Sequence, residues 1–221
     1  MSIDPSTLPE KSPLLSPDLE AQLSPLLAGI TAPFTLVCIG DDGEKSLEMA
    51  TFLNHFTKLC PRLSLRLLSP GEDPAADEAL DASLLPATGF CGDGGLGRAV
   101  FHGVPGGKEI TGFLSALLTF GGAGKPLDRA TLKDIARIKN PLKLQICVSL
   151  ACHHCAQEVM NAQRVAAENP AVTAHMIDAN LYPALVERYS ITRVPVLLCN
   201  GEIIATGGMT MVELCNLLRK H

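Results

Sequence analysis

The sequence contains no tryptophan, and aromatic residues make up only 4% of its 221 residues. Proteins that bind single-stranded nucleic acids stack the bases on aromatic side chains, and nucleic-acid-binding domains in general carry clustered basic residues. The formal net charge of this chain is instead −5 at pH 7. We therefore expect no nucleic-acid partner.

The sequence also lacks a hydrophobic run long enough to cross a bilayer. Its longest stretch without a charge, Ile110 to Gly124, has about 15 residues, whereas a spanning helix needs about 20. The first 20 residues contain several acidic side chains and no apolar core, so no signal peptide is visible. We expect a cytoplasmic protein with no membrane association.

The eight cysteines lack the paired spacing of a secreted disulfide framework. Cys91 lies in a glycine-rich loop, and we assign it no role. Four others lie within apolar strand or helix patterns, which is typical of buried free thiols in a reducing compartment: Cys38, Cys147, Cys199 and Cys215. The exception to this pattern is Cys152-His153-His154-Cys155, a Cys-x-x-Cys pair.

An apolar strand pattern over 142–148 leads into this pair, and a helical pattern starts directly after it. We expect Cys152 at or just before a helix N-terminus, where unpaired N–H groups and the helix dipole favour the thiolate. Cys155 lies one helical turn further on and can close a small disulfide ring. A structural zinc half-site is the alternative, but no second cysteine pair has the spacing of a zinc finger or ribbon. The pair therefore indicates redox chemistry.

Further along the chain, Val194-Pro195 opens an apolar strand. Proline is tolerated at the first position of a strand but not in its interior, and X-Pro bonds are the ones that adopt the cis form. We therefore favour a cis peptide here over an ordinary loop proline. A turn, a short strand over 202–206 and a final helix over 210–219 follow. This order of elements resembles the thioredoxin fold, in which Pro195 would face the two cysteines.

A similar order occurs earlier in the chain, which indicates an internal repeat. The patterns predict strands over 34–39 and 63–68 around a helix over 44–59. Pro86 leads a further strand, where a cis bond with a structural role is again favoured. Gly40-Asp-Asp-Gly stands where the second copy has its cysteines.

The predicted fold is therefore α/β, with two tandem thioredoxin-like folds, each a central mixed β-sheet flanked by helices. We expect a flexible lead-in over 1–20, a first fold without a Cys-x-x-Cys pair over 21–125, and a redox-active second fold over 126–221.

Several segments together resemble the N-terminal domain of the flavoprotein subunit of bacterial alkyl hydroperoxide reductase, and the likeness extends over residues 20–219. They are Phe101-His-Gly-Val-Pro-Gly-Gly-Lys-Glu-Ile, Leu117-Leu-Thr-Phe-Gly-Gly, Ser149-Leu-Ala-Cys-His-His-Cys, and Val194-Pro195 followed by Asn200-Gly and Met209-Thr. The resemblance implies an oxidoreductase that relays electrons from a flavoprotein disulfide reductase to the disulfide of a peroxiredoxin.

The resemblance also implies roles for single residues. Cys152 is then the attacking thiolate and Cys155 the resolving thiol, while Pro195 shapes the groove beside them. Glu109 corresponds to an acidic residue of the family that assists proton transfer. A solvated charge at a helix N-terminus is an equal alternative for Glu109.

The two histidines of the motif differ in what they imply. His153 matches the histidine that the family has after its first cysteine. His154 precedes the resolving cysteine, as in oxidising disulfide isomerases, where an imidazolium stabilises the thiolate and raises the reduction potential.

No Gly-x-Gly-x-x-Gly motif follows a predicted strand. The glycine-rich segment from Gly92 lies between strands and opens no helix, so we reject it as a dinucleotide site. We expect no cofactor and no metal on this chain, with FAD and NAD(P)H carried by a separate reductase. Of two explanations, an excised domain and a stand-alone relay, we favour the stand-alone relay.

Three questions stay open at the level of sequence. One is whether the protein forms a homodimer. The second is whether it is instead a general protein disulfide oxidoreductase or isomerase, which His154 favours and the missing first pair disfavours. The third is whether it is a non-catalytic docking module.

Overall fold

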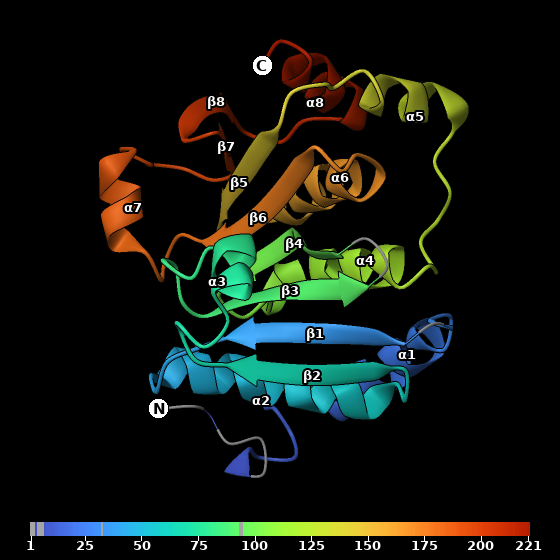
Figure 1. The fold of residues 1–221 in the computed structure, drawn as a ribbon, viewed down its shortest axis with the longest axis vertical. Helices are drawn as coiled ribbons and strands as arrows, with labels where there is room; N and C mark the ends of the chain where they lie inside the picture. Colours follow the sequence, from blue (N-terminus) through green and yellow to red (C-terminus); the bar gives the residue numbers. More distant parts are fainter. Residues whose placement is uncertain (1–2, 4–6, 32, 93–94) are drawn as a thin grey trace. The chain divides into compact units, whose positions relative to one another are not determined.

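A computed structural model of the chain describes residues 3, 7–31, 33–92 and 95–221 (Figure 1). The chain forms two compact units. Unit 1 comprises residues 1–104 and 117–124, and unit 2 comprises residues 105–116 and 125–221. The segment 105–116, which the sequence-based boundary assigns to the first fold, thus belongs to unit 2.

Unit 1 is built on a mixed sheet with the strand order β2-β1-β3-β4. Its strands are β1 (Phe34–Ile39), β2 (Leu63–Leu68), β3 (Ala87–Gly92) and β4 (Gly95–His102), and its helices include α1 (Pro17–Leu27), α2 (Glu44–Leu59) and α3 (Pro74–Leu80). β1 pairs with β2 in parallel and with β3 antiparallel, and β3 pairs with β4 antiparallel.

The core of unit 1 lies on both faces of β1. Val37 and Ile39 pack in one cluster with Ala76 and Leu80 of α3. Because side chains alternate along a strand, Leu36 and its neighbours point to the opposite face. α2, which packs against β1 and β2, covers them there (Figure 1). The continuous apolar run of β1 is therefore explained by burial on both sides.

The segment before α1 corrects the prediction of a flexible lead-in. Leu8 and Leu15 are buried, and the backbone N–H of Ser12 donates to Nδ1 of the buried His55 at 3.2 Å. α1 begins at Pro17, and the Ser16 side chain accepts from the N–H of Leu19 as its N-cap. Two buried leucines and one capped helix therefore dock the described part of this segment on unit 1.

Unit 2 repeats the arrangement, with the strand order β6-β5-β7-β8. Its strands are β5 (Leu142–Val148), β6 (Val172–Asp178), β7 (Val196–Cys199) and β8 (Glu202–Thr206), and its helices are η2 (Gly107–Glu109), α5 (Arg129–Ile135), α6 (Cys155–Glu168), α7 (Pro183–Arg188) and α8 (Met211–Leu218). α4 (Ile110–Phe120) has residues in both units. β5 pairs with β6 in parallel and with β7 antiparallel, and β7 pairs with β8 antiparallel. The prediction of two tandem α/β folds with mixed sheets is confirmed.

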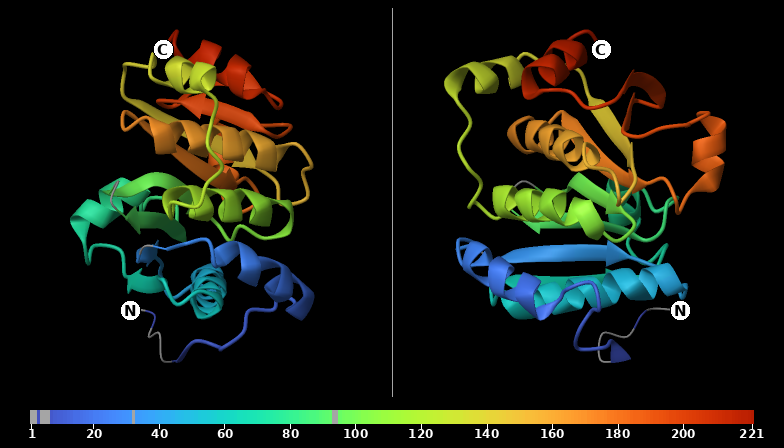
Figure 2. Two further views of the ribbon diagram at one scale, coloured as in Figure 1. Left: turned by 90° about the vertical axis from the view of Figure 1, so that its right-hand side faces the viewer. Right: turned by 180° about the vertical axis from the view of Figure 1, so that it is seen from behind.

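Helices α6, α8 and α5 form one layer of unit 2. α6 packs against β5, β6 and α8, and α5 packs against α8, as the two views in Figure 2 also show. α8 is closed at its start by a capping box between Thr210 and Glu213. This layer positions the segment 207–210 beside α6, where it contributes to the candidate site.

Most of the predicted element bounds agree with the structure, and the exceptions have local causes. The predicted helix up to Lys139 ends at Ile135 instead, although Asp128 caps it as expected. β4 begins at Gly95 rather than Ala99, because the glycine-rich segment forms the end of a hairpin. Residues 93 and 94 of that segment lie outside the described residues. None of the described helices is long and apolar enough to cross a bilayer.

Candidate active site

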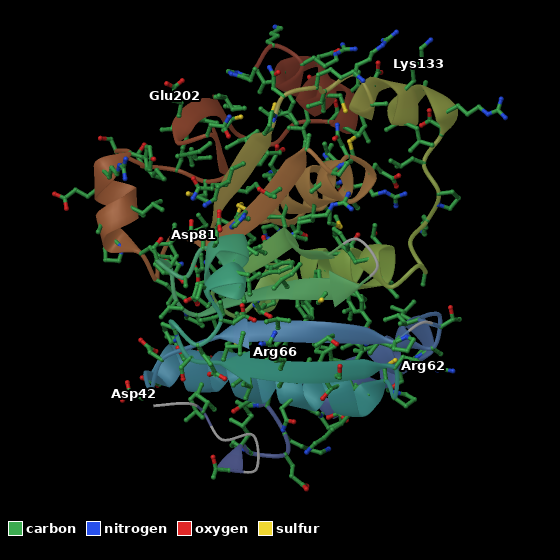
Figure 3. The ribbon with its side chains drawn as sticks, in the orientation of Figure 1. Asp42, Arg62, Arg66, Asp81, Lys133 and Glu202 are labelled. Atoms are coloured by element: carbon green, nitrogen blue, oxygen red, sulfur yellow. A yellow bond between two sulfur atoms is a disulfide. The ribbon has the colours of Figure 1, made fainter. Side chains whose placement is uncertain are left out.

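Cys152 and Cys155 form a disulfide, with their Cα atoms 5.5 Å apart, and a yellow bond marks it in Figure 3. β5 ends at Val148, and a turn in which the N–H of Cys152 donates to the Ser149 carbonyl at 2.8 Å leads into the pair. α6 begins at Cys155, so Cys152 precedes the first helical turn. Cys155 is fully buried, whereas Cys152 is half-buried. Of the two sulfur atoms, the one on Cys152 is thus the more accessible.

Pro195 lies beside this disulfide at the start of β7. Both the Val194–Pro195 and the Leu85–Pro86 peptide bonds are cis, as the sequence predicted. The Val194 carbonyl oxygen lies 4.0 Å from Sγ of Cys152. The structure therefore brings the proline strand and the more accessible sulfur together in unit 2.

The two histidines between the cysteines are exposed. His154 is the N-cap residue of α6, but its side chain makes no capping hydrogen bond. Its Cβ and carbonyl oxygen are the nearest atoms to the space beside Gly208, at 3.8 and 3.9 Å from an added Cβ there. The imidazoles are therefore placed at the surface around the disulfide and are not part of its packing.

Glu109 is the last residue of the short helix η2, and its side chain is fully buried. Among the described residues, neither carboxylate oxygen has a hydrogen-bond partner. Burial, and secondarily the negative charge of Asp178, raise the pKa of Glu109 from 4.5 to about 7. The alternative of a solvated charge is wrong, because solvent does not reach this carboxylate.

The surroundings of Glu109 belong to the cysteine site. The N–H of Lys108 donates to the Leu150 carbonyl at 3.0 Å, which docks η2 on the loop before Cys152. Gly107 has a φ of +55°, and a Cβ there would lie 2.6 Å from the same carbonyl oxygen, so this close approach requires glycine. A Cβ at Gly112 would lie 3.4 Å from Oε2 of Glu109 and 3.9 Å from the Ala156 carbonyl oxygen. The carboxylate thus lies near the first turn of α6.

A second buried carboxylate, which sequence reasoning missed, lies on α6 itself. Glu158 is 1% exposed, and its Oε2 accepts from the N–H of Met209 at 2.7 Å. Asn161, one turn further along the same helix face, donates from Nδ2 to the Met209 carbonyl at 2.9 Å. Both backbone polar groups of Met209 are therefore held by side chains of α6.

The corresponding position of unit 1 carries a polar cap in place of thiols. Oδ1 of Asp41 accepts from the N–H of Gly43 at 3.0 Å and from the Ser46 hydroxyl at 2.6 Å. These bonds lower the pKa of Asp41, the Ser46 bond most strongly. The segment between β1 and α2 is therefore a capped turn without a sulfur atom.

The remaining cysteines do not join the site. Six are free thiols, of which Cys91 is half-buried and the others are buried. Burial raises the pKa of Cys38 and of Cys147 to about 12, so neither is a ready nucleophile. Within the described ranges, no group of three or more histidine, cysteine, aspartate or glutamate side chains is arranged to hold a metal ion.

The comparisons with known proteins agree with this site. A family model described as a thioredoxin domain matches residues 142–219, which contain the disulfide and Pro195. A solved structure of the alkyl hydroperoxide reductase AhpF from Enterococcus faecalis is 33% identical, with a TM-score of 0.87, over 92% of this chain and 99% of that one. The chain belongs to the family of the N-terminal domain of AhpF.

Two further relatives show how far this family assignment extends. The curated AhpF of Pseudomonas aeruginosa is 29% identical over 91% of this chain, but the match covers only 36% of that protein. The chain thus spans about a third of the length of such relatives. A protein disulfide oxidoreductase from Aeropyrum pernix has a TM-score of 0.82 at 19% identity, over 93% of this chain and 92% of that one, which shows a shared fold. The names of these relatives confirm the expectation of an oxidoreductase.

Proposed function

We propose that this protein relays two electrons as a dithiol, from a flavoprotein disulfide reductase to the disulfide of a peroxiredoxin. The observation that carries the proposal is the unequal exposure of the two sulfur atoms beside cis-Pro195. Cys152 is half-buried and reachable, whereas Cys155 is fully buried behind it. A relay needs this asymmetry, because one thiol has to meet the partner and the other has to resolve the linked complex.

The proposed reaction consists of two thiol–disulfide exchanges. The Cys152 thiolate attacks one sulfur of the partner disulfide, which forms a mixed disulfide and releases the first partner thiolate. The Cys155 thiolate then attacks Sγ of Cys152, which forms the 152–155 disulfide and releases the second partner thiolate. The partner gains two electrons and, once both thiolates are protonated, two protons. The reductase restores the dithiol by the same exchanges in reverse.

We assign Glu109 the role of proton acceptor for Cys155. A buried thiol ionises reluctantly, so its attack needs a nearby base. Glu109 has a buried carboxylate close to the first turn of α6, and its pKa is raised to about 7 by burial and by Asp178. A carboxylate with that pKa can accept and return a proton near neutral pH. This support is one of position and acidity.

The proposal assigns no cofactor to this chain and keeps FAD and NAD(P)H on a separate reductase. The second candidate is a general protein disulfide oxidoreductase or isomerase. It is favoured by His154, whose imidazole directly precedes the resolving Cys155. It is disfavoured by the capped turn at Asp41, since unit 1 has no second cysteine pair between β1 and α2.

The reduction potential of the 152–155 pair separates these two candidates. Equilibration in a dithiol redox buffer would give about −270 mV, near that of thioredoxin, for a reducing relay. A potential of about −180 to −120 mV, the range of isomerases and oxidants, would favour the second candidate. In the same assay series, Cys152→Ser abolishes reduction of a peroxiredoxin disulfide, and Cys155→Ser traps the mixed disulfide. Partner reduction that survives Cys152→Ser would refute both redox functions.

A further inference from the structure

A cavity of about 720 Å³ lies next to the disulfide in unit 2. His154, Gln157 and Asn161 line it from the side of α6, and the segment 208–211 with Glu213 lines it from the side of α8. His154 lies between the two cysteines in the chain, so a partner whose disulfide meets Cys152 places its neighbouring residues near this cavity.

The wall formed by segment 208–211 is held in place by α6. Glu158 and Asn161 bind the N–H and the carbonyl of Met209, and Gln157 donates to Oδ1 of Asn161 at 3.0 Å. A buried donor or acceptor that loses its partner costs about 1–3 kcal/mol, so this double contact resists displacement of Met209. The cavity is thus a pre-formed feature of the fold.

The charges around the cavity have one sign. Glu213 is a carboxylate whose pKa is lowered by the hydrogen bonds from the Thr210 N–H and hydroxyl, so it is ionised at neutral pH. Glu158 lies behind Met209, and the charge of Glu213 contributes to the raised pKa of Glu158, after burial as the main cause. No lysine or arginine belongs to the lining. The thioethers of Met209 and Met211 add apolar surface on which an aliphatic stem can lie.

We propose that this cavity is a subsite for one cationic side chain, a lysine or an arginine, that stands beside the redox-active cysteine of the partner protein. The inference rests on the proposed function and adds a specificity determinant to it. The aliphatic part of the cation lies along Met209 and Met211, and its charge faces Glu213. Glu158 and Asn161 act as positioning residues for the wall that the stem contacts.

The test uses three peptides that each contain an intramolecular Cys-x-x-Cys disulfide and differ only in the residues flanking it: lysine, methionine or glutamate. The reduced full chain is mixed with each peptide at pH 8, above the ordinary histidine pKa of about 6.5, to limit positive charge on His154. The second-order rate constant of peptide reduction is followed by separation of the acid-quenched products. The lysine peptide should react about two- to fivefold faster than the methionine peptide, the range expected of a partly exposed ion pair, and the glutamate peptide more slowly.

The matched variants separate the cavity from the net charge of the chain. Glu213→Gln removes one charge but keeps the capping box, which accepts glutamine as well as glutamate, so the lysine preference should fall toward one. Glu202→Gln removes one charge from an exposed position on β8, shown pointing outward in Figure 3, and should leave the preference unchanged. Gln157→Lys should reverse the preference in favour of the glutamate peptide.

Each further outcome has a distinct meaning. Equal rates for the three peptides, or a lysine preference that Glu213→Gln and Glu202→Gln lower equally, would overturn the subsite and leave the relay intact. Failure of the reduced chain to reduce any of the peptides would overturn the relay and, with it, the subsite.

Discussion

Glu109 should make the folded chain less stable as the pH rises through the weakly acidic range. Its carboxyl group is fully buried and has a pKa of about 7, against an ordinary value of 4.5. That difference corresponds to about 3 kcal/mol of unfolding free energy. We expect this loss to appear in the wild-type chain and to be absent from Glu109→Gln.

The sign follows from proton binding in the two states. Below pH 4.5 the carboxyl is protonated in the folded and the unfolded chain, and its stabilisation is fully present. Between about pH 4.5 and 7 the unfolded chain loses the proton while the folded chain keeps it, so stability falls as the pH rises. Above pH 7 both states are ionised and the loss is complete. The steepest loss is about 1.4 kcal/mol per pH unit.

The assay is urea unfolding of the oxidised chain between pH 4 and 8, followed by far-ultraviolet circular dichroism. The quantity of interest is the wild-type unfolding free energy minus that of Glu109→Gln, plotted against pH. Contributions from the other titrating groups, including Glu158, occur in both proteins and cancel. Glu109→Met serves as a second variant and should lack the same pH dependence, which separates the lost charge from the buried amide. A flat difference plot, or one that rises with pH, would refute the account of Glu109 as a buried, unpartnered acid.

Three further predictions concern the packing within each unit. Replacing Thr210, which caps α8, by alanine should lower the unfolding free energy by about 0.5–2 kcal/mol, whereas serine should keep most of it; urea unfolding checks both. Replacing Phe90, which packs against Phe34, Phe101 and Phe120, by alanine should cost about 3–5 kcal/mol by the same measure, and a loss below about 1 kcal/mol would contradict its place in the core. Thiol labelling of the reduced native chain should modify Cys152 and, more slowly, Cys91, because the remaining cysteines are buried; rapid labelling of Cys38 or Cys147 would contradict that burial.

Local sequence patterns predicted the elements whose formation depends on local signals. The bounds of β1, α2 and β2 agree with those expected from hydrophobic periodicity, since each has an apolar face or run between clear turn residues. The cis form of the bond before Pro195 was predictable for the same reason, because an X-Pro bond that opens a strand has few alternatives. Where the local signal is weak, as at the end of α5, the predicted bounds were wrong by several residues.

The parts of the site that sequence patterns missed depend on contacts between distant residues. Glu158 occupies an ordinary polar position in a helical pattern, and its burial results from its bond to Met209, 51 residues away. Asn161 meets the same residue across 48 positions. A single sequence carries no signal for such pairs, because neither partner has a propensity that the other would change.

Glu109 and Glu158 together show what the second unit has that the first lacks. In unit 1 the carboxylate of Asp41 accepts hydrogen bonds at the start of α2, and the pKa of that group is lowered. In unit 2 two carboxylates are buried near the start of α6, and burial raises the pKa of each. A fold without functional demand satisfies its buried acids or exposes them, because an unpartnered buried acid destabilises it. The retained cost in unit 2 is therefore best explained by proton transfer at Cys155 for Glu109, and by the fixed wall of segment 208–211 for Glu158.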